Sequence, residues 1–238
     1  MSGIEYGIIA VAIVAASCLQ ASIGFGLGML AAPVIALIEP TLLPGIIIMM
    51  SLVVTTMVVI RERTQLDLRG AGWALIGRIP GSVLGAYLVV VLPIKWLAFA
   101  IGAVVLGGVL ISFLGWRPHP RRVTLVAAGT VSGVFGTALA IGGPPMALVW
   151  QGMDAARMRG TMSAFYLVGS FVSLISLFVV GAIDTATAEV AGWMVPTLVL
   201  GYLLSRLVNR YLNKQRLRLV ALLVSAASAI LVIVDQVF

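Results

Sequence analysis

Long apolar runs, separated by short polar or glycine-rich segments, extend along the chain. They fall at about residues 4–22, 27–38, 41–60, 73–92, 96–115, 123–139, 143–152, 160–182, 190–208 and 217–237. A helix needs about 20 apolar residues to cross a bilayer, and several of these runs are long enough. The runs at 27–38 and 143–152 would span only about 15 to 18 Å as helices. The pattern therefore predicts an all-α polytopic membrane protein with about 8–10 helical segments.

Each of the two short runs is preceded by a glycine-rich segment that leads into a proline. The glycines are Gly24, Gly26 and Gly28 in the first segment and Gly136, Gly142 and Gly143 in the second. Because glycine and proline interrupt helices, we expect a break in each segment and a re-entrant hairpin around it. The N-terminus of each returning half-helix would offer unpaired N–H groups with a partial positive charge. The two breaks are therefore candidate sites for an anion.

The two halves of the chain resemble each other weakly at an offset of about 110 to 120 residues. The matched positions are Ser22, Phe25, Gly26 and Pro33 with Ser132, Phe135, Gly136 and Pro144, Gly45 with Gly160, and Gly72 with Gly192. We therefore predict two membrane repeats, residues 1–116 and 117–238, that together form one transporter domain.

Composition and charge narrow the class of protein. Charged residues make up 10% of the chain and hydrophobic residues 61%, which excludes a water-soluble domain because such domains are about one-quarter charged. The net charge of +7 comes from short clusters between apolar runs, which is typical of cytoplasmic loops and not of a nucleic-acid-binding surface.

The positive-inside rule predicts the orientation of the chain. It assigns most of the basic residues to the cytoplasmic side, namely Arg61, Arg63, Arg69, Arg117, Arg121, Arg122, Arg157, Arg159, Arg206, Arg210, Lys214, Arg216 and Arg218. The outer side receives Lys95 with Glu5, Glu39, Asp184, Glu189 and Asp235. Both termini are then outside, and the two repeats have opposite orientations. Such inverted repeats are typical of secondary transporters, whose solute site lies near the midplane where broken helices meet.

Hydroxyl side chains form a stripe on the run at 160–182. Ser163, Tyr166, Ser170 and Ser173 follow one another at spacings of three and four residues, and the repeat aligns Ser51 and Thr55 with Tyr166 and Ser170. These hydroxyls could line a solute path and donate to anionic oxygens. Alternatively, they bond to the preceding turn of their own helix or to a neighbouring helix.

Three further features concern single polar residues and a glycine series within the apolar runs. Arg78, five residues after Trp73, either acts as a gate for an anion or snorkels to the cytoplasmic interface. Gln20 is a candidate for the polar lining of the first break, because it needs a partner inside the membrane. Gly77, Gly81 and Gly85 have the spacing of close helix packing. The candidate substrate-binding set is Gln20, Ser22, Gly24, Gly26, Gly28, Ser51, Thr55, Gly136, Thr137, Gly142, Gly143, Tyr166 and Ser170, with Arg78 as the gate.

Catalytic and metal-binding groups are sparse. No Asp or Glu falls near the centre of a predicted span, and His119 and Cys18 are the only residues of their kinds. They cannot form a catalytic triad or a zinc site. We therefore expect no enzyme activity, no metal and no cofactor.

Both halves also share a tryptophan, a proline and a glycine after the glycine-rich segment. These are Trp73, Pro80 and Gly85, echoed by Trp193, Pro196 and Gly201. Together with the paired glycine-rich segments, this arrangement resembles the TauE/SafE sulfite-exporter family. The resemblance implies transport of sulfite, sulfoacetate or other small organosulfonates, usually by export. It carries binding roles only to Gly24, Gly26, Gly28, Gly136, Gly142 and Gly143.

The sequence thus predicts a multi-pass transporter of small anions in a cell membrane, expected to be bacterial, that works by alternating access. An anion channel or uniporter and a cation-coupled importer of sulfur-containing or carboxylate solutes remain alternatives. The expected partners are the small anionic solute and the lipid bilayer, without nucleic acid; assembly into a homo-oligomer stays open.

Overall fold

The structure, a computed structural model, describes residues 2–114 and 118–211 and isolated positions between 223 and 234. Within these ranges the chain is helical, as predicted, and the helices are α1 (Gly3–Ile23), α2 (Leu27–Ile38), α3 (Gly45–Glu62), α4 (Leu68–Val91), α5 (Ile94–Leu114), α6 (Arg122–Ala138), α7 (Gly143–Trp150), α8 (Ala155–Val179) and α9 (Thr185–Tyr211). By length and composition, α1, α3, α4, α8 and α9 can each cross a membrane. The predicted run at 217–237 lies largely outside the described residues.

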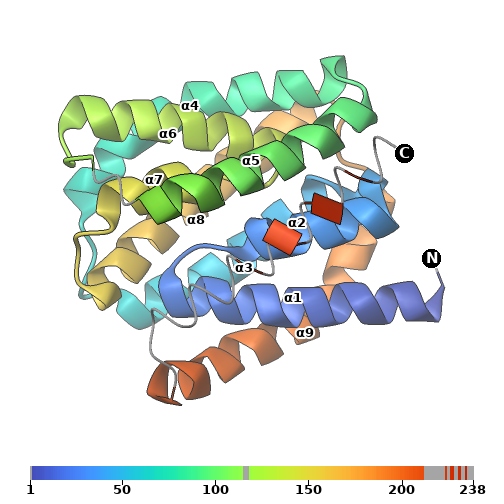
Figure 1. Ribbon diagram of the computed structural model, residues 1–238, viewed down its shortest axis with the longest axis horizontal. Coiled ribbons are helices and arrows are strands. Elements are labelled where there is room, and N and C mark those ends of the chain that lie inside the picture. Colours follow the sequence, from blue (N-terminus) through green and yellow to red (C-terminus); the bar gives the residue numbers. More distant parts are fainter. Residues whose placement is uncertain are drawn as a thin grey trace.

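Three helix pairs, each of which joins the two halves of the chain, form the body of the bundle (Figure 1). Helix α1 packs along α9, α4 packs along α6, and α3 packs along α8 between these two pairs. The short helices α2 and α7 each pack against the helix that precedes them, and both also contact α5. Each helix break, α1/α2 and α6/α7, is therefore followed by a short helix that contacts α5.

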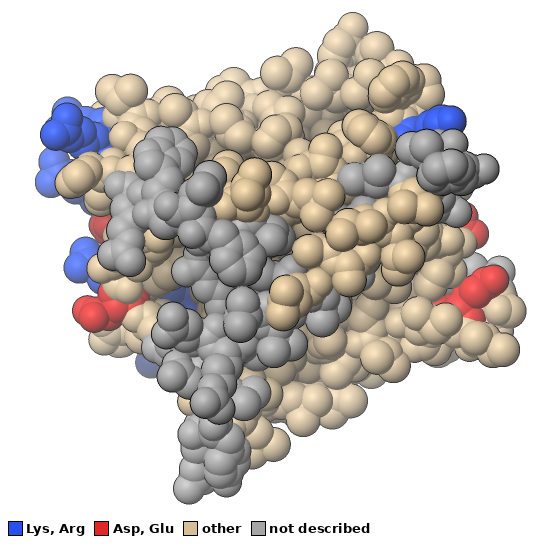
Figure 2. All heavy atoms as spheres, viewed as in Figure 1, with Lys and Arg blue, Asp and Glu red and all other residues tan. Residues whose placement is uncertain are grey.

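Charged side chains lie at two opposite ends of the face shown in Figure 2, and the described residues visible between these ends are uncharged. Three contacts join the arginine-bearing helix ends: Glu62 with Arg159 at 2.8 Å, Arg61 with the Ala21 carbonyl at 2.6 Å, and Arg122 over the Trp73 ring. The contacts bring the ends of α1, α3, α4, α6 and α8 together. The side of the membrane that this arginine-rich end faces stays a prediction.

Helices α4 and α6 pack with almost no space between their backbones. A Cβ atom added to Gly77 would overlap the Val126 carbonyl, and one added to Gly81 would overlap the Thr130 carbonyl. From the other side, a Cβ atom on Gly129 would overlap the carbonyl of α4 at Ala74. Close packing through the α4 glycines is therefore confirmed, and it holds the middle of α4 directly against α6.

We expect Gly81→Val to destabilise the protein, because the helices must separate to admit the side chain. Overpacking of this kind costs about 1–3 kcal/mol, so the midpoint of thermal unfolding in detergent should fall clearly. Gly72→Val is the matched control, since it lies on the same helix and has no atom within 4 Å of an added Cβ. Equal unfolding midpoints for the two variants would contradict this account of the α4–α6 contact.

Candidate functional site

The first break lies between α1 and α2 and depends on two glycines. Gly24 has φ of 93° and Gly26 has φ of 117°. Residues with a Cβ atom rarely adopt such positive φ angles, whereas glycine adopts them readily. The backbone N–H of Leu27, at the start of α2, donates to Gln20 Oε1 at 3.2 Å. Gln20 therefore lies in the polar lining of the break, as expected, and satisfies one of the free N–H groups of the first turn.

The second break, between α6 and α7, presents fewer backbone donors. Helix α7 starts at Gly143, and Pro144 and Pro145 follow in its first turn without N–H groups. The N-terminus of α7 therefore offers fewer N–H groups than that of α2. Its preceding residue, Gly142, instead presents a carbonyl that accepts hydrogen bonds from Ser132 Oγ at 2.7 Å and Tyr166 OH at 3.1 Å.

The two breaks touch each other although they are far apart in sequence. A Cβ atom on Gly28, in the first turn of α2, would overlap the Ala140 carbonyl in the second break. A Cβ atom on Gly143 would come within 3.2 Å of the Phe25 ring in the first break. Glycine at these two positions therefore permits the breaks to approach, and a cavity forms beside their contact.

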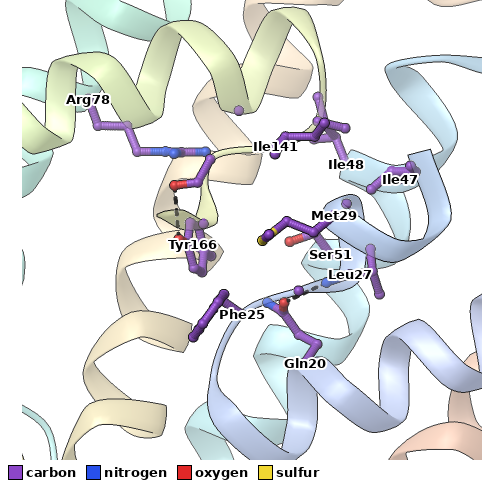
Figure 3. Close-up of a pocket in the computed structure, with 16 residues that line it drawn as sticks. Gln20, Phe25, Leu27, Met29, Ile47, Ile48, Ser51, Arg78, Ile141 and Tyr166 are labelled. Atoms are coloured by element: carbon purple, nitrogen blue, oxygen red, sulfur yellow. Dashed lines mark hydrogen bonds between the residues drawn. The ribbon is translucent and has the colours of Figure 1, made fainter. Parts of the chain in front are cut away.

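The cavity has a volume of about 40 Å³, which is room for about three water molecules or one small ion. It is lined by Gln20, Phe25, Gly26, Leu27, Gly28, Met29, Ile47, Ile48, Ser51, Arg78, Gly136, Ala140, Ile141, Gly142, Gly143 and Tyr166. Arg78 and Tyr166 lie on one side of it, and Gln20, Leu27 and Met29 lie on the other (Figure 3). Arg78 is about 15 Å along α4 from Leu68, so its backbone lies near the middle of that helix.

Arg78 is the charged group of the cavity. Its side chain is buried at 3% exposure, and its Nη1 donates to the Ser132 carbonyl at 3.0 Å and to Ser132 Oγ at 2.8 Å. The guanidinium carbon lies 4.9 Å from the centre of the Phe165 ring and 5.4 Å from that of Tyr166, within the range of cation–π attraction. The alternative of snorkelling to the interface is therefore wrong.

The charge of Arg78 has no carboxylate partner in the part of the chain that the structure describes. The ion pairs found there are Arg61–Glu62, Arg157–Asp67 and Arg159–Glu62. The Nε atom of Arg78 is buried and lacks a hydrogen-bond partner among the described residues. Burying an unpaired charge is costly, so the cavity holds a positive charge that an anion would stabilise.

Three glycines make room for the Arg78 guanidinium. Cβ atoms on Gly136 and on Gly142 would each lie 3.0 Å from its terminal nitrogens, and one on Gly169 would overlap Nε. Gly169 of α8 was missed in the sequence analysis. It lies inside the predicted hydroxyl stripe, next to Ser170, but its role depends on the reach of Arg78 from another helix, which the stripe does not reveal.

The cavity gathers most of the predicted substrate-binding residues. These are Gln20, Gly26, Gly28, Ser51, Gly136, Gly142, Gly143 and Tyr166, together with the predicted gate Arg78. Apolar side chains that were not predicted to bind the solute complete its wall. Phe25 had a match in the repeat, at Phe135, whereas nothing in the sequence distinguishes Leu27, Met29, Ile47, Ile48 and Ile141 from other membrane-helix residues.

The remaining predicted residues lie outside the cavity lining. Thr55 donates to the Ser51 carbonyl of its own helix at 2.6 Å, as the alternative interpretation of the stripe proposed. Thr137 hydrogen-bonds to Ser173 at 2.6 Å. Ser170 donates to Ser51 Oγ at 3.2 Å and so supports a cavity residue from behind.

Two further members of that set, Ser22 and Gly24, lie at the arginine-rich side of the first break. Ser22 is buried, and a Cβ atom on Gly24 would come within 2.9 Å of the Arg159 backbone. Gly24 therefore packs against α8, and neither Gly24 nor Ser22 lines the cavity.

Comparison with known proteins identifies the family of the chain. No curated protein and no solved structure matches it. The family model described as Sulfite exporter TauE/SafE matches residues 8–232, which is nearly the whole chain. The broken helices and the apolar spanning helices of this chain are therefore those of a multi-pass membrane transporter. The chain belongs to the TauE/SafE sulfite exporter family.

Proposed function

We propose that the cavity at Arg78 is the solute site and that the solute is a small anion, most directly sulfite or a small organosulfonate. One observation carries the proposal: a fully buried arginine faces a cavity that no described carboxylate neutralises. In a membrane protein such a charge needs a partner, and an anionic solute supplies one. Membership of a sulfite-exporter family supports a sulfur oxyanion in particular.

The packing of the helices supports two inverted repeats, residues 1–116 and 117–238, around this cavity. If α1 corresponds to α6 and α4 to α9, the α1–α9 contact between the halves corresponds to the α6–α4 contact, and both contacts occur. The central α3–α8 pair then joins equivalent helices. A solute site between two oppositely oriented halves can be exposed to either side by a rocking motion of one half against the other.

An ion pair joins α3 and α8 at the arginine-rich end. Glu62 of α3 and Arg159 of α8 meet at 2.8 Å, with only 12% and 14% of their side chains exposed. In the proposed cycle, α3 and α8 must separate there before the solute can pass. We assign this end to the cytoplasm, which leaves both termini outside and agrees with the positive-inside rule for a bacterial cell membrane.

The direction that we favour is export. An inside-negative potential drives a monovalent anion outward by about 2.3 kcal/mol per 100 mV, so export needs no coupling carboxylate. The cavity lining, all of it within the described residues, contains no Asp or Glu. A channel or uniporter and a cation-coupled importer are the alternatives.

Counterflow in proteoliposomes tests the proposal. Vesicles loaded with unlabelled sulfite should take up labelled sulfite faster than empty vesicles, and the uptake should saturate and be independent of a Na⁺ gradient. Uptake that internal sulfite does not accelerate would indicate a channel in place of a carrier. Uptake that requires Na⁺ would indicate coupled import in place of export. Sulfite flux no greater than in protein-free vesicles would refute the proposed function.

A further inference from the structure

The cavity contains one full positive charge. Arg78 is the only ionised side chain that lines it, and the Tyr166 hydroxyl already donates to the Gly142 carbonyl. On the opposite wall, the first turn of α2 adds a partial charge of about +0.5 at most, and one of its donors is already bonded to Gln20. The prolines in the first turn of α7 remove donors from the other break.

From this charge, we propose that the site selects singly charged anions over doubly charged anions of the same shape. The inference rests on the proposed function and narrows its substrate class to monoanionic sulfonates and hydrogensulfite. A monoanion and Arg78 form a neutral pair, whereas a dianion leaves one negative charge buried. An uncompensated buried charge costs several kcal/mol.

The shape of the cavity supports the same selection. The polar groups Arg78 and Tyr166 lie on one side, and Met29, Ile47 and Ile48 lie on the other (Figure 3). A tetrahedral sulfonate can direct its oxygens to the guanidinium and its apolar substituent to the wall formed by Met29, Ile47 and Ile48. A sulfate ion would direct an oxygen there without a hydrogen-bond donor, which is unfavourable. The volume of about 40 Å³ restricts the substituent to a small group.

Methanesulfonate and sulfate provide a direct test with the wild-type protein. Both are tetrahedral and of similar size, and near neutral pH the first stays a monoanion and the second a dianion. We expect methanesulfonate to inhibit labelled sulfite uptake at a concentration at least about tenfold lower than sulfate, and to raise the unfolding midpoint of detergent-purified protein more strongly.

A charge-addition pair tests the physical cause. Met29→Lys places a second positive charge at the apolar wall and should bring the inhibitory concentrations of the two anions within about threefold of each other. Met29→Gln, which is neutral and of similar length, is the matched control and should retain the preference for methanesulfonate. The wild-type comparison decides the selection even if Met29→Lys does not fold.

The outcomes separate this inference from the proposed function. Sulfate that inhibits as well as methanesulfonate, while sulfite is transported, would overturn the monoanion selection and leave the transporter intact. The same conclusion follows if sulfite is transported and neither anion competes. If sulfite itself is not transported, the proposed function fails, and the inference fails with it.

Discussion

Arg78→Gln is expected to abolish sulfite transport without lowering the heat stability of the protein. Removing one member of a buried, hydrogen-bonded charge pair costs about 2–5 kcal/mol of binding, which corresponds to a loss of affinity of about thirtyfold or more. The binding loss should appear as the disappearance of sulfite-dependent stabilisation, and the transport loss as the disappearance of counterflow.

The stability of the variant without anion distinguishes a binding role of Arg78 from a purely structural one, because only a structural role predicts a lower unfolding midpoint. In wild type, Arg78 is buried without a carboxylate among the described residues, so a neutral side chain removes a desolvation cost. We therefore expect the unfolding midpoint without anion to stay equal or rise.

Arg69→Gln is the matched control, because Arg69 lies nine residues earlier on the same helix and is exposed. It should retain transport and anion-dependent stabilisation. Unchanged sulfite affinity in Arg78→Gln would show that the anion binds elsewhere. A strongly lowered midpoint would instead assign Arg78 a structural role.

The second large effect is expected from Gly169→Ala. The new methyl group would overlap Arg78 Nε, so the guanidinium must leave its position between α6 and α8 although its charge remains. We expect the sulfite concentration for half-maximal counterflow to rise by about tenfold or more, which corresponds to about 1.4 kcal/mol.

Two controls show whether this effect acts through Arg78. Gly72→Ala, where an added Cβ has no atom within 4 Å, should leave transport unchanged. In an Arg78→Ala background, Gly169→Ala should cause no further loss of anion-dependent stabilisation, because the truncated side chain no longer reaches Gly169. Additive losses in the double variant would show that Gly169 acts independently of Arg78.

The helix breaks show how far local sequence can predict this fold. The lengths of the apolar runs predicted short helices at 27–38 and 143–152, and the structure has them at Leu27–Ile38 and Gly143–Trp150. Gly24 and Gly26 adopt positive φ angles, which glycine tolerates. These features depend on backbone sterics and apolar length, which act over a few residues and can be read directly from the sequence.

The hydroxyl stripe shows where local sequence becomes ambiguous. Ser170 and Tyr166 have the same kind of polar side chain and helical spacing, yet only Tyr166 lines the cavity. Ser170 bonds to Ser51 instead. The difference depends on the rotation and depth of α8 relative to α3, which the packing of both helices decides.

By itself, the sequence determined that the chain crosses a membrane as helices and breaks at two glycine-rich segments, because apolar length and glycine conformation are local properties. Only the tertiary structure decided that Arg78 is buried beside both breaks, since the sequence was equally compatible with snorkelling. Its burial requires glycines at positions 136, 142 and 169, on segments distant in sequence, to leave space for one guanidinium. Such long-range complementarity has no local pattern.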